Sequence, residues 1–197
     1  MRVLHVVGSS KFGGASRVIL SLCNMARYNN IEPYVLVSNP ENQKYYRKNN
    51  IGVVDFKGID RPIRPWKDFY DTLRLASYLK QNKFDIVHTH TIKGGLVGRL
   101  AAYIANVPVI IYHAHAFLLG VFNNSCIDWC IAAIEKTASH WCDIILTTTS
   151  QEKAEALRYR ICAPEKIVVA HNGIPDLEPP EILNSSNFIR AELGAGT

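Results

Sequence analysis

Two pairs of histidines have the residue type and spacing of a ligand site. His88 and His90 form one His-x-His pair, and His113 and His115 form a second. Side chains two residues apart on an extended strand point to the same side. An imidazole can hydrogen-bond a sugar hydroxyl or a phosphate, and it titrates near neutral pH. Because four of the seven histidines gather in this way, the sequence predicts a bound ligand at these pairs.

Thr91 and Lys93 follow the first pair directly and extend the candidate site. Lys93 would bring positive charge to an anionic substrate; the alternative is a solvated lysine at the start of a helix. We therefore expect His90, Thr91, Lys93 and His113 to contact substrate.

A metal ion is the competing occupant of the two pairs. No Asp, Glu or Cys stands within residues 88–95 or 113–116, so no familiar mixed ligand set is complete there. A single histidine is usually satisfied at a sheet edge without any ligand, but four together favour an organic ligand. The prediction is a site without a metal.

A glycine-containing loop joins the first predicted strand to the first helix. Residues 8–17 read GSSKFGGASR, with Gly13 and Gly14 adjacent to each other. The pattern is neither G-x-G-x-x-G nor a Walker A loop. Backbone amides at a helix start can receive a phosphate, and paired glycines permit close approach. The alternative is a tight strand-to-helix turn with no ligand.

A basic loop lies between two later elements. Arg61, Arg64, Trp66 and Lys67 stand close together in residues 57–67. Cationic side chains beside a tryptophan suit the interface of an anionic membrane. The competing interpretation is a solvated loop with Trp66 packed inward.

Short β-branched runs alternate with segments of helical periodicity, and these elements must position the candidate residues. The predicted strands are residues 2–7, 34–37, 52–56, 84–88, 107–112, 143–148 and 166–170. Two of the helical stripes between them are Phe69, Leu73, Ala76 and Leu79, and Ile127, Cys130, Ile131, Ile134, Ala138 and Trp141. The order predicts an α/β fold with a doubly wound, mostly parallel, Rossmann-like sheet and helices on both faces. In such a sheet the ligand lies outside the carboxyl ends of the strands, at the topological switch point.

Composition sets the class of protein and its partners. The chain has 197 residues, 48% of them hydrophobic and 20% charged, which excludes a disordered, collagen-like or coiled-coil chain. We expect a cytoplasmic protein, because the sequence shows neither a signal peptide nor an apolar run of membrane-spanning length. A net charge of +5 favours anionic partners. No dense Lys/Arg run indicates nucleic acid, so we expect none.

The five cysteines include no Cys-x-x-Cys pair. Cys126 and Cys130 lie one helical turn apart in an apolar pattern, and we expect buried, reduced thiols there.

The end of the chain changes character after residue 174. Residues 175–181 are proline-rich and acidic, which is typical of a semi-rigid connector. We expect a domain over residues 1–174, followed by residues 175–197 as a linker and the start of a missing C-terminal domain. A frayed tail is the alternative.

Three stretches together resemble the N-terminal half of a family 4, GT-B fold, retaining glycosyltransferase. They are GGASRV at 13–18, DIVHTH at 85–90 running to GRLAA at 98–102, and HNGI at 171–174. Their order and spacing are similar to those of bacterial enzymes that build capsule, exopolysaccharide and O-antigen units. The resemblance covers residues 1–180 and implies a Rossmann-like acceptor-side domain facing a donor-binding domain.

The resemblance also implies residue roles. Gly13 and Gly14 match the loop that approaches the donor diphosphate, and His115 matches a catalytic histidine that contacts the transferred sugar. Ala116 replaces the glycine that usually follows this histidine, and Ser16 stands where the family often has glutamate. No Glu-x7-Glu pair occurs, which agrees with a missing donor domain. The chain shows no convincing carboxylate nucleophile, with Asp128 and Asp143 as the untested candidates.

The activity implied is transfer of a sugar from a nucleotide-sugar donor to a lipid-linked or growing glycan acceptor. The nucleotide sugar is a co-substrate, and neither a cofactor nor a metal is expected. The chain by itself is expected to be inactive, with attachment to the inner membrane face as a further expectation. One alternative is a non-catalytic subunit that binds acceptor or membrane and recruits a donor-binding chain. Another is a GT-B-like sugar-nucleotide epimerase, which needs no acceptor.

Overall fold

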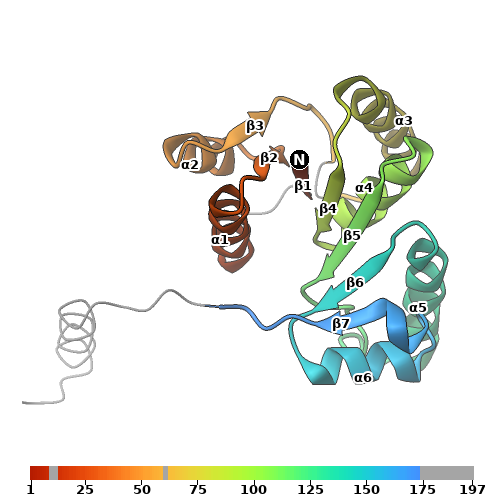
Figure 1. Cartoon of the computed structure of the whole chain (residues 1–197). Coiled ribbons are helices and arrows are strands. Elements are labelled where there is room, and N and C mark those ends of the chain that lie inside the picture. The colour runs from red at the N-terminus through yellow and green to blue at the C-terminus, as the bar shows by residue number, and fades with distance from the viewer. Residues whose placement is uncertain (9–12, 60–61, 174–197) are drawn as a thin grey trace, which may run out of the picture.

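A computed structural model describes residues 1–8, 13–59 and 62–173 of the chain. In this part of the chain, seven parallel strands form one sheet with the order β3-β2-β1-β4-β5-β6-β7 (Figure 1). The strands are β1 (Arg2–Val7), β2 (Glu32–Val37), β3 (Gly52–Val54), β4 (Ile86–His90), β5 (Val109–Ala114), β6 (Ile144–Thr147) and β7 (Ile167–Val169). The predicted doubly wound, Rossmann-like α/β fold is confirmed.

The helices connect successive strands and cover both faces of the sheet. They are α1 (Gly14–Tyr28), α2 (Pro40–Lys48), α3 (Pro65–Asn82), α4 (Ile92–Ile104), α5 (Ser125–Ser139) and α6 (Ser150–Arg158), with the short 3-10 helix η1 (Pro164–Lys166). α1 and α2 lie on one face, whereas α3 to α6 pack on the other (Figure 1).

The topological switch point lies between β1 and β4. From β1 the chain winds outward to β2 and β3, and α3 then returns it to β4 on the other side of β1. Because α1 and α4 leave these two adjacent strands toward opposite faces of the sheet, the carboxyl ends of β1 and β4 are the expected position of a ligand. The fold therefore directs a ligand to the edge where β4 ends in His90.

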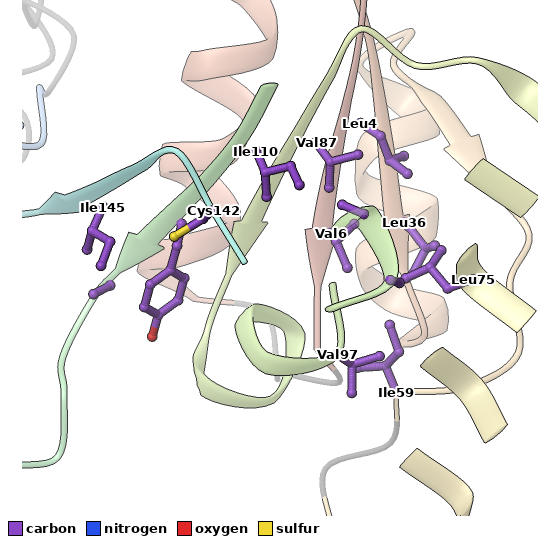
Figure 2. Close-up of a cluster of buried hydrophobic side chains, with 14 of the residues drawn as sticks. Leu4, Val6, Leu36, Ile59, Leu75, Val87, Val97, Ile110, Cys142 and Ile145 are labelled. Carbon is purple, nitrogen blue, oxygen red and sulfur yellow. The ribbon is translucent and has the colours of Figure 1, made fainter. Parts of the chain in front are cut away.

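The larger core lies between the sheet and the helices α3 to α6. Leu4 and Val6 of β1 and Val87 of β4 meet Leu75 of α3 and Val97 of α4 (Figure 2). A second cluster on the opposite face packs Ile19 and Cys23 of α1, and Tyr46 of α2, against β1 and β2. Strands buried on both faces account for the nearly continuous apolar runs in the sequence.

The apolar stripe expected on α3 is buried only in its second half, and the stripe expected on α5 is mostly turned outward. On α3, Phe69 and Leu73 are 55% and 43% exposed, while Leu75, Ala76 and Leu79 are buried. This helix carries apolar residues on more than one face, and only one face can reach the core.

The expectation that Cys126 and Cys130 are buried is wrong, because both thiols are exposed. α5 instead turns Asp128 and Glu135 inward, where Asp128 accepts a hydrogen bond from the Gly120 amide and Glu135 pairs with Arg99. Satisfying these two buried carboxylates fixes the rotation of the helix and leaves the cysteines outside.

No helix of the described residues has the length and apolarity needed to cross a membrane.

Candidate functional site

Five histidines meet on the α1-facing side of the sheet, at the carboxyl half of its central strands. His5 of β1 is opposite His88 of β4, and His90 of β4 is opposite His113 of β5. His115 follows β5 on the same side as His113, because their spacing is two residues. The structure thus brings both predicted pairs together and adds His5.

The five rings form a stacked layer. Ring centroids are 4.3 Å apart for His88 and His90, and 4.5 Å apart for His113 and His115. Between strands, the ring of His90 lies 5.7 Å from His113 and 5.8 Å from His115. Nδ1 of His5 and Nε2 of His90 are 3.1 Å apart and share a hydrogen bond. The layer is continuous from β1 to the loop after β5.

Burial keeps the layer neutral at physiological pH. Loss of hydration lowers the pKa of His5 and that of His113 to about 4, with a smaller repulsive effect of His113 on His5 and of His115 on His113. It also lowers the pKa of His88 and of His90 well below the usual value. The ordinary titration of histidine near neutral pH is therefore lost here, and the site offers neutral donors and acceptors rather than positive charge.

His115 is the most accessible member of the layer and has a carboxylate nearby. Burial lowers the pKa of His115, and the charge of Glu152 partly opposes that shift. Glu152 accepts hydrogen bonds from Thr148 and Thr149, and it completes a capping box at the start of α6. A helix cap thus also places negative charge beside the outermost histidine.

Thr91 joins the two loops of the switch point. Its hydroxyl accepts hydrogen bonds from the Gly8 amide at 3.3 Å and from the Gly94 amide at 3.4 Å. A Cβ on Gly94 would come within 2.5 Å of the Gly8 nitrogen, so only glycine permits this approach. Thr91 itself has φ 62° and ψ 166°, a strained conformation for a β-branched residue. The strained residue, Thr91, lies where the end of β1 contacts the start of α4.

Gly13 and Gly14 lie at the N-terminus of α1, as the glycine loop predicts. Gly13 is the residue before the first helical turn and no side chain of the described residues caps it. A Cβ placed on Gly14 would meet no described atom within 4 Å. Space and amide dipoles for an anion are therefore present at Gly14.

Lys93 makes an ion pair at the start of α4. Its Nζ lies 2.6 Å from Oδ1 of Asp68 and also donates to the backbone oxygen of Pro62. This contact links α4 to the start of α3, and it partly neutralises the charge that Lys93 could offer a substrate.

The basic loop is placed at and before the start of α3. Trp66 is 89% exposed, so the alternative in which it packs inward is wrong. Arg64 is exposed as well, while Lys67 forms an ion pair of 2.7 Å with Asp71. Arg61 lies outside the described residues.

Neither carboxylate candidate for a nucleophile lies at the histidine layer. Asp143 accepts a hydrogen bond of 2.7 Å from the Ile110 amide, at the amino end of β5. Asp128 accepts a hydrogen bond of 2.9 Å from the Gly120 amide, on the face of the sheet that α5 covers. Ser16 is buried and donates to Asn42 at 3.1 Å, so it ties α1 to α2.

A cavity of about 110 Å³ adjoins the layer. Val18 and Leu22 of α1 form one wall, with His113 and Leu146 on the sheet opposite, and His171 is part of the lining. It has room for a few water molecules only. A hollow of about 520 Å³ lies at the amino ends of β2 and β3 instead, away from the histidines.

The sequence also matches a protein family over most of its length. Residues 12–176 match the model of Glycosyltransferase Family 4. The chain belongs to glycosyltransferase family 4. It is 31% identical over 118 residues to the Escherichia coli UDP-Gal:α-D-GlcNAc-diphosphoundecaprenol α-1,3-galactosyltransferase. That match covers 60% of this chain and 30% of the Escherichia coli enzyme.

Solved structures share the fold of this family 4 domain. Anabaena HepE in complex with UDP and glucose superposes with a TM-score of 0.73 at 17% identity, covering 98% of this chain and 50% of HepE. UDP-GlcNAc 2-epimerase from Methanocaldococcus jannaschii gives a TM-score of 0.61 at 18% identity, covering 87% of this chain and 46% of the epimerase. This chain therefore spans about half the length of these two proteins.

Two residues of the candidate site were missed by the sequence analysis. His5 is a single polar residue inside an apolar strand, and its placement beside His88 depends on β1 being next to β4. That adjacency follows from doubly wound topology, so His5 could have been found from its parity in the strand. Glu152 has a sequence signal as well, since Thr149 and Glu152 have capping-box spacing.

Proposed function

We propose that this family 4 glycosyltransferase domain transfers a hexose, with retention of configuration, from a nucleotide-sugar donor to a lipid-linked or growing glycan acceptor. The family match over residues 12–176 carries the proposal. The Escherichia coli relative supports a donor of the UDP-sugar type and a diphosphoundecaprenol-linked acceptor, as its name states. A role in polysaccharide biosynthesis follows from such an acceptor.

Departure of the nucleotide develops negative charge on its diphosphate. Amides at the N-terminus of α1, at Gly13 and Gly14, would stabilise that charge without a metal ion or a separate cofactor. The histidine layer is neutral, so its part is to hydrogen-bond sugar hydroxyls rather than to pair with phosphate. His115 is the histidine proposed to contact the transferred sugar, with His90, Thr91, Lys93 and His113 on the acceptor side.

A donor-binding half is required for turnover in this scheme. The chain covers 50% of HepE, and the proposal assigns residues 1–174 to the acceptor-side domain and residues 175–197 to a connector. Residues 174–197 lie outside the described part. The 197-residue chain alone is expected to be inactive, because loss of preorganised donor contacts costs orders of magnitude in rate.

We also infer that α3 docks on an anionic membrane surface at the cytoplasmic face. Four apolar side chains form one stripe along the helix. Trp66, Phe69, Tyr70 and Leu73 are 89%, 55%, 62% and 43% exposed, respectively. Arg64 at the start of the helix is exposed beside them. An apolar stripe flanked by positive charge lies in the headgroup region of a bilayer.

The transfer activity is tested with the full-length protein, labelled UDP-sugars and a diphosphoundecaprenol-linked sugar acceptor. We expect label to enter the lipid fraction only when donor and acceptor are both present. A labelled nucleotide sugar converted to its epimer without acceptor would instead establish the epimerase alternative. If the full-length protein binds acceptor but turns over only after a second chain is added, the partner-subunit alternative holds.

Two substitutions locate the site in the same assay. His115→Ala should reduce turnover at least about tenfold. It removes one hydrogen bond to the transition state, and a loss of about 1.4 kcal/mol corresponds to a tenfold slower rate. Gly14→Ala should raise the donor KM without loss of stability, because no atom of the described residues lies within 4 Å of the Cβ position, where the donor diphosphate is proposed to approach. His140→Ala, at an exposed histidine of the α5 C-terminus, is the matched control. Wild-type kinetics in both variants would remove the site assignment.

A further inference from the structure

A groove between α5 and α6 combines aromatic walls with basic side chains. Its volume is about 540 Å³, and it lies on the face of the sheet opposite the histidine layer (Figure 1). Hollows of this size are typical of small-molecule sites. The lining of this α5–α6 groove consists of Trp129, Ala132, Ala133 and Lys136 from α5, with Arg158, Tyr159 and Arg160 from the end of α6. The function proposed above makes no use of it.

Three cations in the groove have no acidic partner. Lys136, Arg158 and Arg160 are exposed, and none of them forms an ion pair or a side-chain hydrogen bond with another residue in the described ranges. The carboxylate of Asp128, to which the Tyr159 hydroxyl donates at 3.5 Å, is buried, and its other oxygen already accepts a backbone hydrogen bond. Like charges around one hollow repel each other. The groove therefore favours an anionic ligand, and guanidinium groups suit carboxylates and phosphates.

The aromatic wall limits which anions fit. Trp129 is 57% exposed, and its ring meets that of Tyr159 edge to face, with the ring centroids 5.3 Å apart. The guanidinium of Arg158 lies 5.8 Å from the centre of the Tyr159 ring. The indole is thus held in place beside the cations while more than half of it stays exposed. A ligand with a flat apolar face can stack there, because Ala132 and Ala133 are small and leave room beside the indole.

Arg160 occupies a backbone position that normally takes glycine or asparagine. Its φ of 53° is left-handed, and the Ile161 amide donates to the Ala156 oxygen at 2.9 Å, which is the hydrogen bond of a Schellman turn. The equivalent position after three other helices is asparagine: Asn30, Asn50 and Asn106. An arginine costs more than an asparagine in this conformation. A ligand contact of its side chain in the groove would offset that cost.

We propose that the α5–α6 groove binds anionic saccharides of the hexuronate type. The apolar face of a pyranose ring stacks on Trp129, while carboxylates pair with the arginines of α6 and with Lys136 of α5. Because the cations belong to both walls, a chain of acidic sugars with one carboxylate per residue matches them better than a nucleotide, whose charge is all at one end. Neutral sugars fit poorly, since the charged side chains of the lining donate hydrogen bonds and accept none.

The use of this groove rests on the function proposed above. A growing acidic glycan held there stays close to the domain that extends it, which raises the effective concentration of its free end. Binding itself requires no transfer activity, so binding without transfer would contradict only the proposed function. Transfer without binding in the groove would contradict only the saccharide site.

Isothermal titration calorimetry with trigalacturonate tests the proposal. We expect one site per chain, affinity that falls as NaCl is raised, and no binding of maltotriose, which is neutral. Triglutamate carries several carboxylates but no sugar ring, and it should bind at least about tenfold more weakly because it cannot stack on the indole. UDP and vesicles with anionic phospholipid are tested in parallel, and their binding should not depend on Arg160.

Arg160→Asn is the most informative variant. It removes one cation but suits the left-handed backbone, so the urea midpoint should stay the same or rise. Affinity for trigalacturonate should nevertheless fall at least about tenfold, as expected for the loss of a charge-assisted hydrogen bond. Lys83→Asn is the matched control, because Lys83 is also exposed and left-handed, with φ 47°, at the end of α3. It should bind as wild type does.

Substitutions at Trp129 test the stacking contact. Trp129→Ala should weaken binding of trigalacturonate about tenfold, whereas Trp129→Phe keeps a ring and should retain most of the affinity. Circular dichroism establishes that both variants are folded.

Four results would overturn the proposal. The first is an absence of trigalacturonate binding by the wild-type protein at millimolar concentration. The second is equal weakening by Lys83→Asn and Arg160→Asn, which would mean attraction to net charge alone. The third is equal affinity for triglutamate and trigalacturonate without an effect of Trp129→Ala, which would indicate an acidic peptide or any anion. The fourth is binding of UDP or vesicles that depends on Arg160, which would assign the groove to a nucleotide or a lipid headgroup.

Discussion

A neutral imidazole and a charged one offer different chemistry, and the surroundings of the histidine layer decide which is present. His88 and His90 are in contact with His5 and His113, and burial lowers the pKa of all four. Each can hydrogen-bond a hydroxyl, but none adds charge for a diphosphate at neutral pH. In the function proposed above, the contacts to phosphate would therefore come from backbone amides at the start of α1 rather than from these histidines.

The same burial makes the stability of the domain depend on pH. The pKa of His5 and that of His113 are about 4 when folded, against about 6.5 in an unfolded chain. Between pH 6.5 and 4 the unfolded state binds more protons, so the free energy of unfolding falls as the pH falls. Each such histidine contributes a slope of about 1.4 kcal/mol per pH unit in that window, and none above it.

Urea unfolding at several pH values, with chelator present, measures this effect. His113→Phe should have a shallower decline than wild type between pH 6.5 and 4, because one titrating group is removed. Carboxylates common to both proteins cancel in the comparison. Identical slopes would mean that His113 is solvated and titrates normally in the folded protein.

At the scale of elements, a buried ion pair joins the helices behind the sheet. Nη2 of Arg99 on α4 is 2.9 Å from Oε2 of Glu135 on α5, and Nε of Arg99 donates to the Gly95 oxygen. The guanidinium also lies 3.8 Å from the ring centre of Tyr112 on β5. These contacts fix α4, which begins directly after Thr91 and carries Lys93 in its first turn, against β5, which contains His113.

Removing one partner of this pair should be costly. Arg99→Met leaves Glu135 charged and buried, and we expect a loss of about 3–5 kcal/mol in the free energy of unfolding. The double variant Arg99→Met, Glu135→Leu should recover most of that loss. Glu32→Gln, which breaks the exposed contact of 3.7 Å with Arg2, is the control and should change stability by at most about 1 kcal/mol. Urea unfolding followed by circular dichroism distinguishes these outcomes, and equal effects at the two pairs would contradict the assignment.

The sequence predicts the positions of the strands better than the rotation of the helices about their own axes. All seven strands follow from β-branched runs, because a parallel sheet covered on both faces keeps its strands apolar. The pairs His88–His90 and His113–His115 could be placed from strand parity alone. The rotation of α5 could not, since it depends on Asp128 and Glu135 finding partners on other elements.

At the scale of the whole molecule, the two faces of the sheet differ: one carries the candidate site and the other the larger hydrophobic core. The histidine layer lies on the face covered by α1 and α2, near the carboxyl ends of the strands. The larger core is buried on the other face, under α3 to α6 (Figure 1). α3 is the helix of that second group with an exposed aromatic stripe beside basic residues. A membrane held by α3 would therefore lie on the far side of the sheet from α1, and the contact of Lys93 with Asp68 would connect the docking helix to the end of β4.

Sedimentation with vesicles tests that docking at the level of the intact molecule. The stripe should hold the protein on vesicles that contain anionic phospholipid, and Trp66→Ser with Phe69→Ser should reduce binding at least about tenfold, because each aromatic ring contributes about 1.5–3 kcal/mol when fully buried. A matched double variant on the opposite face, Met25→Ser with Tyr28→Ser, removes side chains that are 62% and 85% exposed on α1. It should sediment as wild type does.

Arg64→Glu should weaken binding to anionic vesicles and leave binding to neutral vesicles unchanged, since its effect is electrostatic. If the α1 and α3 variants lose binding equally, the attachment is not specific to α3; if neither loses any, α3 does not contact the bilayer and its exposed aromatics serve another surface.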